Sequence, residues 1–140
     1  MNYATQQDMI DRFSEDEIRR LSDRAEPPAG EIDAAVVARA LTDASLLIDG
    51  YLSGRYQLPI ISPPALLGQL ACDIARYHLH DDMPTDAVTQ RHKDALAHLK
   101  LISDGKIKLQ VAGIQTPESA ADVRLEAPGQ KFSRKTLGGF

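Results

Sequence analysis

The sequence contains no tryptophan, few aromatic residues and a single cysteine. These shortages limit the composition of the core and the possible disulfide bonds. Aromatic residues make up 5% of the 140 positions, whereas hydrophobic residues together reach 43%, close to the globular average. We therefore expect one domain with a modest core of Leu, Ile, Val and Ala. Cys72 has no second cysteine, which excludes an internal disulfide and is typical of a reducing cytoplasm.

Long apolar runs are also missing. Residues 1–12 are polar and lack the apolar centre of a signal peptide. No stretch of about 18 apolar residues could cross a bilayer. The sequence therefore predicts a soluble protein that is made in the cytoplasm and kept there, or in something assembled there, with no membrane partner.

Residues that could carry chemistry are sparse. Cys72 lies 6 and 8 positions before the histidines His78 and His80, too far along a helix for a nucleophile and its base. On a continuous helix His78 and His80 point about 200° apart and cannot hold one metal ion, although they could converge if the helix ended near residue 77. No glycine-rich phosphate loop follows a strand. We predict no enzyme activity, and no catalytic, cofactor-binding or metal-binding residues.

What the sequence does have is helical periodicity. Apolar residues recur at steps of three and four, and Thr5 with Asp8 and Ser14 with Glu17 are spaced as capping boxes. The pattern predicts helices over residues 6–13, 15–22, 33–53, 63–80 and 86–103. The predicted fold class is all-α, a small bundle of about four to five helices with a short β-like segment and an extended C-terminal tail.

The character of the chain changes after Gly105. Residues 106–111 alternate polar and apolar side chains, which is the period of a half-buried strand. Residues 113–140 are rich in Gly, Pro, Ser and charge without a sustained period, so we expect most of them to be disordered in an isolated subunit. We divide the chain into a helical domain, 1–105, and a β-like segment with a flexible tail, 106–140.

The end of the helix predicted over 33–53 has the composition of a rigid elbow. Gly54 is expected to end the helix in a left-handed conformation, and Arg55 to bond the last carbonyls of that helix. Tyr56 should pin the exit of the chain against the core, and Pro59 should keep the following segment extended. A helix cap and turn would by itself account for these four residues.

Charge is distributed unevenly between the two parts. Residues 1–105 hold 10 Lys and Arg against 17 Asp and Glu, a net charge of −7, whereas residues 106–140 hold 6 against 3, a net charge of +3. An acidic body argues against a nucleic-acid footprint. The last ten residues combine cations with apolar side chains that need a partner to be buried, and we predict that they form a docking tail: Lys131, Phe132, Arg134, Lys135, Leu137 and Phe140.

Several short runs, taken in order, resemble a family of proteins encoded among the head and neck genes of Mu-like phages and prophages. The runs are Tyr3-Ala4-Thr5 with Asp8-Met9, Ala40-Leu41-Thr42-Asp43-Ala44, Ile48-Asp49-Gly50-Tyr51-Leu52, Arg55-Tyr56-Gln57-Leu58-Pro59 and Asp73-Ile74-Ala75-Arg76-Tyr77. The resemblance covers roughly residues 3–109. Each pair of residues is weak alone, and the set in this order is fairly specific.

The resemblance implies a head–tail connector, also called an adaptor or head-completion protein. Such a subunit would form a homo-oligomeric ring beneath the portal, contact tail or tail-completion proteins, and extend a channel through which DNA passes without specific binding. It would be located in the neck of the virion and be assembled in the cytoplasm of the bacterial host. The alternative is a small DNA-binding helical module, such as a packaging subunit of the small-terminase kind.

Overall fold

The computed structural model describes residues 2–81 and 83–110, and its regular elements are all α-helices. These are α1 (Gln6–Phe13), α2 (Glu15–Ser22), α3 (Ala34–Leu52), α4 (Ala65–Leu79) and α5 (Asp86–Ser103). The prediction of an all-α fold is confirmed. The first, second and fifth helices have the predicted bounds.

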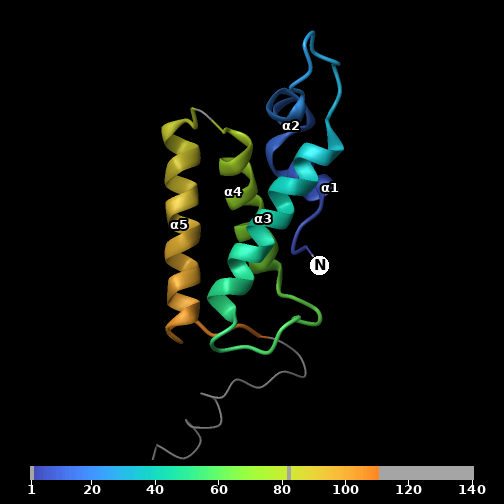
Figure 1. The fold of residues 1–140 in the computed structure, drawn as a ribbon. Coiled ribbons are helices and arrows are strands. Elements are labelled where there is room, and N and C mark those ends of the chain that lie inside the picture. The colour runs from blue at the N-terminus through green and yellow to red at the C-terminus, as the bar shows by residue number, and fades with distance from the viewer. Residues whose placement is uncertain (1, 82, 111–140) are drawn as a thin grey trace, which may run out of the picture.

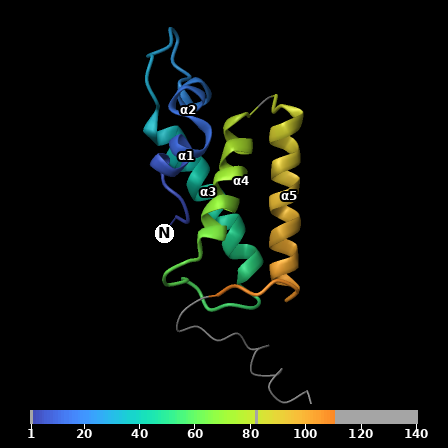
Figure 2. The ribbon, with the colours of Figure 1, turned by 180° about the vertical axis from the view of Figure 1, so that it is seen from behind.

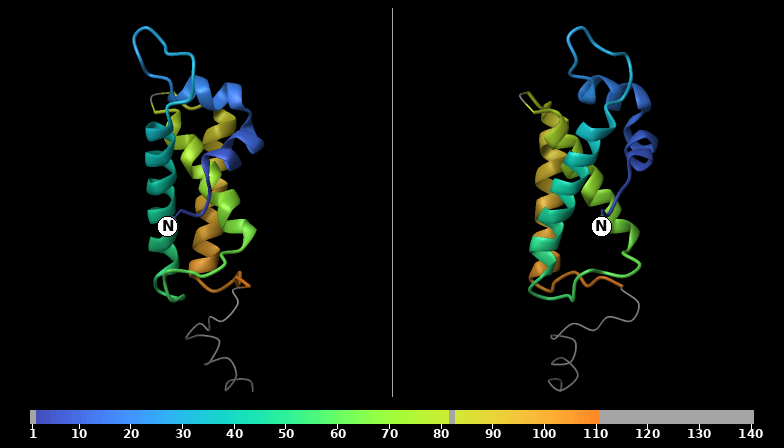
Figure 3. Two further views of the ribbon diagram at one scale, coloured as in Figure 1. Left: turned by 90° about the vertical axis from the view of Figure 1, so that its right-hand side faces the viewer. Right: turned by 45° about the vertical axis from the view of Figure 1, so that its right-hand side comes forward.

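Three antiparallel helices form the body (Figure 1). α3, α4 and α5 run in alternating directions side by side, and α3 makes its most extensive contact with α4. The same arrangement seen from behind, in Figure 2, has α1 and α2 on the side away from α5. The two short helices contact α3 and α4 near the beginning of α3, where Figure 3 shows them meeting at a corner.

Local capping explains where most of the helices begin. The Thr5 hydroxyl accepts from the Asp8 amide at 3.2 Å, and the Asp8 carboxylate accepts from the Thr5 amide at 2.9 Å, which completes a capping box. Asp33 and Thr85 cap α3 and α5 with their side chains. At Ser14 the chain turns between α1 and α2 with a φ of 91°.

The predicted start of α4 at residue 63 is two residues too early. α4 begins at Ala65, its N-cap is Pro64, and no side chain caps it. Ser62, with a φ of 57°, lies two residues before that N-cap. Pro64 disfavours helical backbone at Pro63, the residue before it, which delays the helix.

The core consists of the inward faces of the helices. Small side chains at Ala40 and Ala44 of α3, and at Ala71 and Ala75 of α4, are buried in the core. Larger side chains from all five helices fill the remaining space and are at most 2% exposed: Met9, Ile18, Val37, Ile48, Leu52, Leu67, Ile74, Val88, Leu99 and Ile102. A core with few aromatic residues is therefore closed by aliphatic packing.

The predicted β-like segment is not a strand. Residues 106–110 have no regular secondary structure. Their alternation nevertheless corresponds to burial, because Ile107 and Leu109 pack half-buried against the core while Lys106 and Lys108 are exposed. The expected tail, and Val111 at the end of the segment, lie outside the described residues. No helix in the described part of the chain is long and apolar enough to span a membrane.

Candidate functional site

The predicted elbow after α3 differs in conformation from the expectation. Gly54 does not have a positive φ, and no atom of the described residues lies within 4 Å of where its Cβ would be. The C-cap of α3 is Ser53, in right-handed geometry, and the Arg55 and Tyr56 amides both donate to the Leu52 carbonyl, at 3.0 and 2.8 Å. These bonds end the helix without a left-handed residue, so the expected left-handed cap at Gly54 is wrong.

Arg55 connects the ends of two helices. Its Nε donates at 3.0 Å to the carbonyl of Ser103, the last residue of α5, so the carbonyl it bonds belongs to another helix than the one expected. The left-handed glycine of this region is Gly105, with a φ of 82°. A Cβ at Gly105 would lie 2.7 Å from Cζ of Arg55. The backbone conformation therefore favours glycine there, and a larger residue would also displace the guanidinium of Arg55.

Tyr56 completes this connection, which we call the lower joint (Arg55, Tyr56, Ser103, Gly105 and Leu109). Its side chain is only 5% exposed, and its hydroxyl accepts from the Leu109 amide at 2.9 Å. In a β-sheet the Leu109 amide would donate to a carbonyl of a neighbouring strand. Here it donates to the Tyr56 side chain instead. Beyond Tyr56, the Leu58–Pro59 peptide bond is cis and Ile60 is buried. The residues of the predicted docking tail, 131–140, lie outside the described part.

The N-terminal segment is attached to α3 by polar contacts that the sequence reasoning missed. The Tyr3 hydroxyl donates to the Asp49 carboxylate, and the Tyr3 amide donates to the Ser45 hydroxyl at 3.0 Å. Burial, followed by the Asp49 carboxylate, raises the pKa of Tyr3 above its ordinary value. A Cβ at Gly68 would lie 3.2 Å from the Tyr3 carbonyl oxygen, so a residue without a side chain lets the segment lie close to α4.

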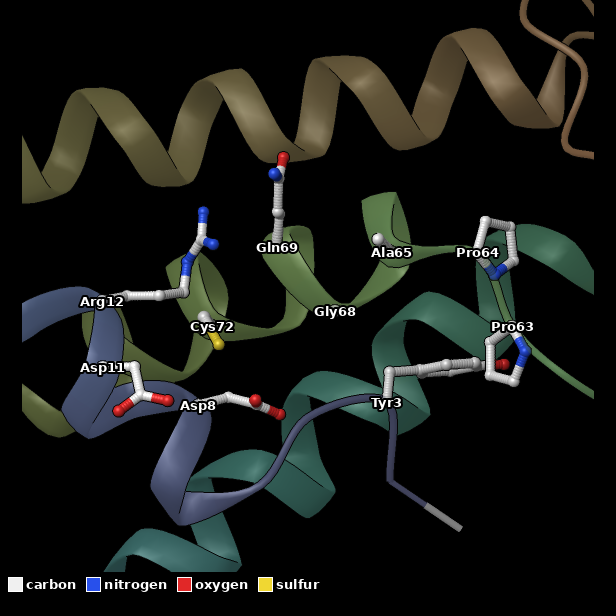
Figure 4. Close-up of a pocket in the computed structure, with 10 residues that line it drawn as sticks. All are labelled: Tyr3, Asp8, Asp11, Arg12, Pro63, Pro64, Ala65, Gly68, Gln69 and Cys72. Carbon is white, nitrogen blue, oxygen red and sulfur yellow. The ribbon is translucent and has the colours of Figure 1, made fainter.

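A cavity of about 360 Å³ lies between this segment, α1 and the first half of α4 (Figure 4). Asp8, Asp11 and Arg12 of α1 border it, and Cys72 of α4 lies at its inner side. The Cys72 side chain is 1% exposed, and burial raises its pKa to about 11. The thiol is therefore protonated at neutral pH, whereas a nucleophile would need the thiolate.

Three of the four histidines lie near the end of α4 or in the first half of α5. The rings of Tyr77 and His92 stack with centroids 3.9 Å apart and an interplanar angle of 4°, and the His78 ring is 6.2 Å from that of His92. His80 follows the end of α4 as its C-cap. Across residues 2–81 and 83–110, no three His, Cys, Asp or Glu side chains are grouped so as to hold a metal ion.

A partly buried ion pair joins α2 to α4. Arg76 donates to Glu17 with Nε and Nη2, at 2.6 and 3.2 Å, and its guanidinium lies 4.3 Å from the centre of the Phe13 ring. The Arg76 and Glu17 side chains are 20% and 19% exposed. Because Arg76 follows Glu17 by 59 positions, no local spacing in the sequence indicated the pair. The ion pair, together with the contact to Phe13, attaches α1 and α2 to α4.

These features define a small helical protein whose described polar contacts join helix ends and terminal segments to one another. A family model described as "Bacteriophage Mu, Gp36" matches residues 3–127. The chain belongs to this family, so the resemblance to Mu-like phage and prophage proteins is confirmed.

Two relatives match along almost their whole length. The chain is 35% identical over 140 residues to "Gene product J" of Escherichia phage Mu, which covers 99% of each chain. It is also 35% identical over 139 residues to "Mu-like prophage FluMu protein gp36" of Haemophilus influenzae, which covers 99% of this chain and 97% of the relative. The chain is therefore a phage or prophage protein.

Proposed function

We propose that this protein is a head–tail connector subunit that forms a ring beneath the portal and extends the DNA channel of the virion. The observation that carries the proposal is family membership across nearly the whole chain, together with the connector role that the resemblance implies. In this role the protein catalyses nothing. Its partners are further copies of itself, the portal and tail or tail-completion proteins, and it acts in the neck after assembly in the host cytoplasm.

Three exposed apolar side chains are available for contacts with neighbouring subunits. Leu46 on α3, Ile61 in the α3–α4 connection and Met83 in the α4–α5 connection are 63%, 69% and 82% exposed. They lie on three separate parts of the described chain. In a ring each subunit contacts its two neighbours through two different surfaces. Contacts with the portal and with tail proteins need further surfaces.

Charge supports passage of DNA rather than its capture. The net charge of −7 on residues 1–105 repels the phosphate backbone. Two arginines on α4 and α5 are paired with carboxylates, Arg76 with Glu17 and Arg91 with Asp73 at 3.5 Å, which reduces their availability for phosphates. A DNA-binding packaging module would need an unbalanced basic surface. Titration of the purified protein with duplex DNA at low salt distinguishes the two functions, and salt-sensitive binding would favour the packaging module.

The decisive experiment removes the gene from an inducible phage or prophage. We expect DNA-filled heads without attached tails, and normal virions when the gene is supplied in trans. Electron microscopy of the lysate gives the phenotype, and mass spectrometry of purified virions gives the location of the protein. Heads that accept tails at the normal yield without the gene would contradict the proposal, as would absence of the protein from complete virions.

A further inference from the structure

A shallow apolar groove lies between the C-terminal halves of α3 and α5. It has a volume of about 300 Å³ and is lined by Leu46, Leu47, Gly50, Tyr51 and Ser103. Leu46 is 63% exposed beside it, and Leu101 of α5 is 38% exposed. Aliphatic and aromatic side chains that remain open to solvent in this way are stabilised when a partner covers them.

Gly50 in this groove has no explanation within the described monomer. It lies inside α3, where glycine is less favourable than alanine. Its φ is not positive, and no atom of the described residues lies within 4 Å of where its Cβ would be. Neither backbone conformation nor packing inside the subunit requires glycine there. A group that approaches the helix from outside would require it.

The chain itself carries a segment with suitable chemistry. Residues 131–140 hold three cations, no carboxylate side chain, and the apolar side chains Phe132, Leu137 and Phe140. The body they would meet has a net charge of −7 over residues 1–105, so attraction at long range favours the encounter. An apolar side chain in the groove, with cations near an acidic surface, satisfies both parts of this composition.

The length and direction of the chain favour a groove on another copy. After α5 the chain runs beneath the bundle, away from α5, to Leu109 beside Tyr56 (Figure 1). Twenty residues, 111–130, then separate the described part from Lys131. A flexible chain of that length spans about 25 Å, close to the length of about 28 Å expected for a helix like α3. A tail of that span is long enough to extend past the edge of its own subunit.

We propose that the α3–α5 groove receives residues 131–140 of a neighbouring copy of this chain, with an apolar side chain of that segment seated against Gly50. This inference rests on the proposed ring, since each subunit then gives a tail to one neighbour and accepts one from the other. When the ring is complete, every groove holds the C-terminal segment of one neighbouring subunit.

Disulfide capture in full-length protein tests the contact. In a Cys72→Ala background, one chain carries Ser103→Cys in the groove and a second carries Thr136→Cys in the tail. Oxidation of the mixture is expected to give the mixed dimer at least ten times more efficiently than the pair in which Ala38→Cys, on an exposed part of α3, replaces Ser103→Cys. Equal capture by the two pairs would overturn the proposal. A loop formed only within a chain carrying both Ser103→Cys and Thr136→Cys would show occupancy of its own groove and overturn the neighbour assignment.

Filling the groove provides the second test. Gly50→Leu should leave the melting temperature unchanged or higher, since nothing in the described monomer lies against that position. It should reduce both the capture yield and ring formation at least tenfold, whereas the matched variant Ala38→Leu should change neither. Normal rings with Gly50→Leu would overturn the inference and leave the connector function intact. A gene deletion that still yields tailed virions would instead overturn the connector function.

Discussion

The guanidinium of Arg55 occupies the space that a side chain at position 105 would need, with Cζ 2.7 Å from the site of a Cβ. The same arginine bonds the carbonyl of Ser103 at 3.0 Å, so the end of α5 is held against the exit of α3. Two chain segments that leave the bundle at this end are thereby fixed relative to each other. The tail predicted to dock on a partner begins beyond this joint.

The first prediction concerns Gly105. Gly105→Ala should lower the free energy of unfolding by about 1–3 kcal/mol, because alanine is strained at a φ of 82° and its Cβ meets Arg55. Gly54→Ala is the control and should be neutral or stabilising, since Gly54 needs no special conformation. Urea unfolding measures both, and the loss at Gly105 should be smaller when Arg55→Ala is also present. Equal losses at positions 54 and 105 would contradict the assignment of the joint.

The second prediction concerns the bond between Tyr56 and Leu109. Tyr56→Phe keeps the buried ring and removes the acceptor of the Leu109 amide, which should cost about 0.5–1.5 kcal/mol. Hydrogen exchange at Leu109 should accelerate more than exchange at the amides inside α3. Tyr51→Phe, on the half-buried face of α3, is the matched control and should leave Leu109 unchanged. Unaltered exchange at Leu109 in Tyr56→Phe would show that the bond does not hold the segment.

The third prediction follows from the raised pKa of Tyr3. Above its ordinary value of 10.0, an unfolded chain loses the phenolic proton while the folded chain retains it. Stability should therefore fall as the pH rises beyond about 10, and the slope should be shallower in Tyr3→Phe. Melts between pH 8 and 11 measure the slope, with Tyr51→Phe as the control. An identical slope in Tyr3→Phe and the parent protein would refute the contribution of Tyr3.

The fourth prediction concerns acid. Burial lowers the pKa of His92 and of His80, so below the ordinary value of 6.5 the unfolded chain binds more protons than the folded chain. Stability should fall as the pH decreases through 6.5. His92→Phe keeps a ring to stack on Tyr77 and should reduce this loss, whereas His98→Gln on the exposed face of α5 should not. If the two variants behave alike between pH 7 and 5, burial of His92 does not contribute to the acid response.

The fifth prediction concerns the tail. Deletion of residues 128–140 should leave the helical content and melting temperature unchanged, because the described residues already form a core from all five helices. It should block ring formation or attachment to the portal, because the deletion removes the apolar side chains that are predicted to dock on a partner. Circular dichroism measures the first effect, and the yield of tailed virions measures the second. A normal yield would mean that the tail is dispensable.

Local sequence determined the helices. Thr5, Ser14, Asp33 and Thr85 satisfy free amides within one turn of themselves, so their effect can be recognised without knowledge of the fold. Periodic apolar residues then identify the buried face of each helix. The bounds of α4 were less accurate because consecutive prolines restrict the backbone without indicating which residue starts the helix.

Only the tertiary structure decided how distant groups are paired. The sequence cannot distinguish Gly54 from Gly105 as the left-handed residue, because the choice depends on where Arg55 and Leu52 lie. It also cannot tell that residues 106–110 lie against Tyr56 instead of a strand, since alternation reports burial and says nothing of the hydrogen-bond partner. Contacts such as Tyr3 with Asp49 arise between segments far apart in the chain, and packing of the complete bundle brings them together.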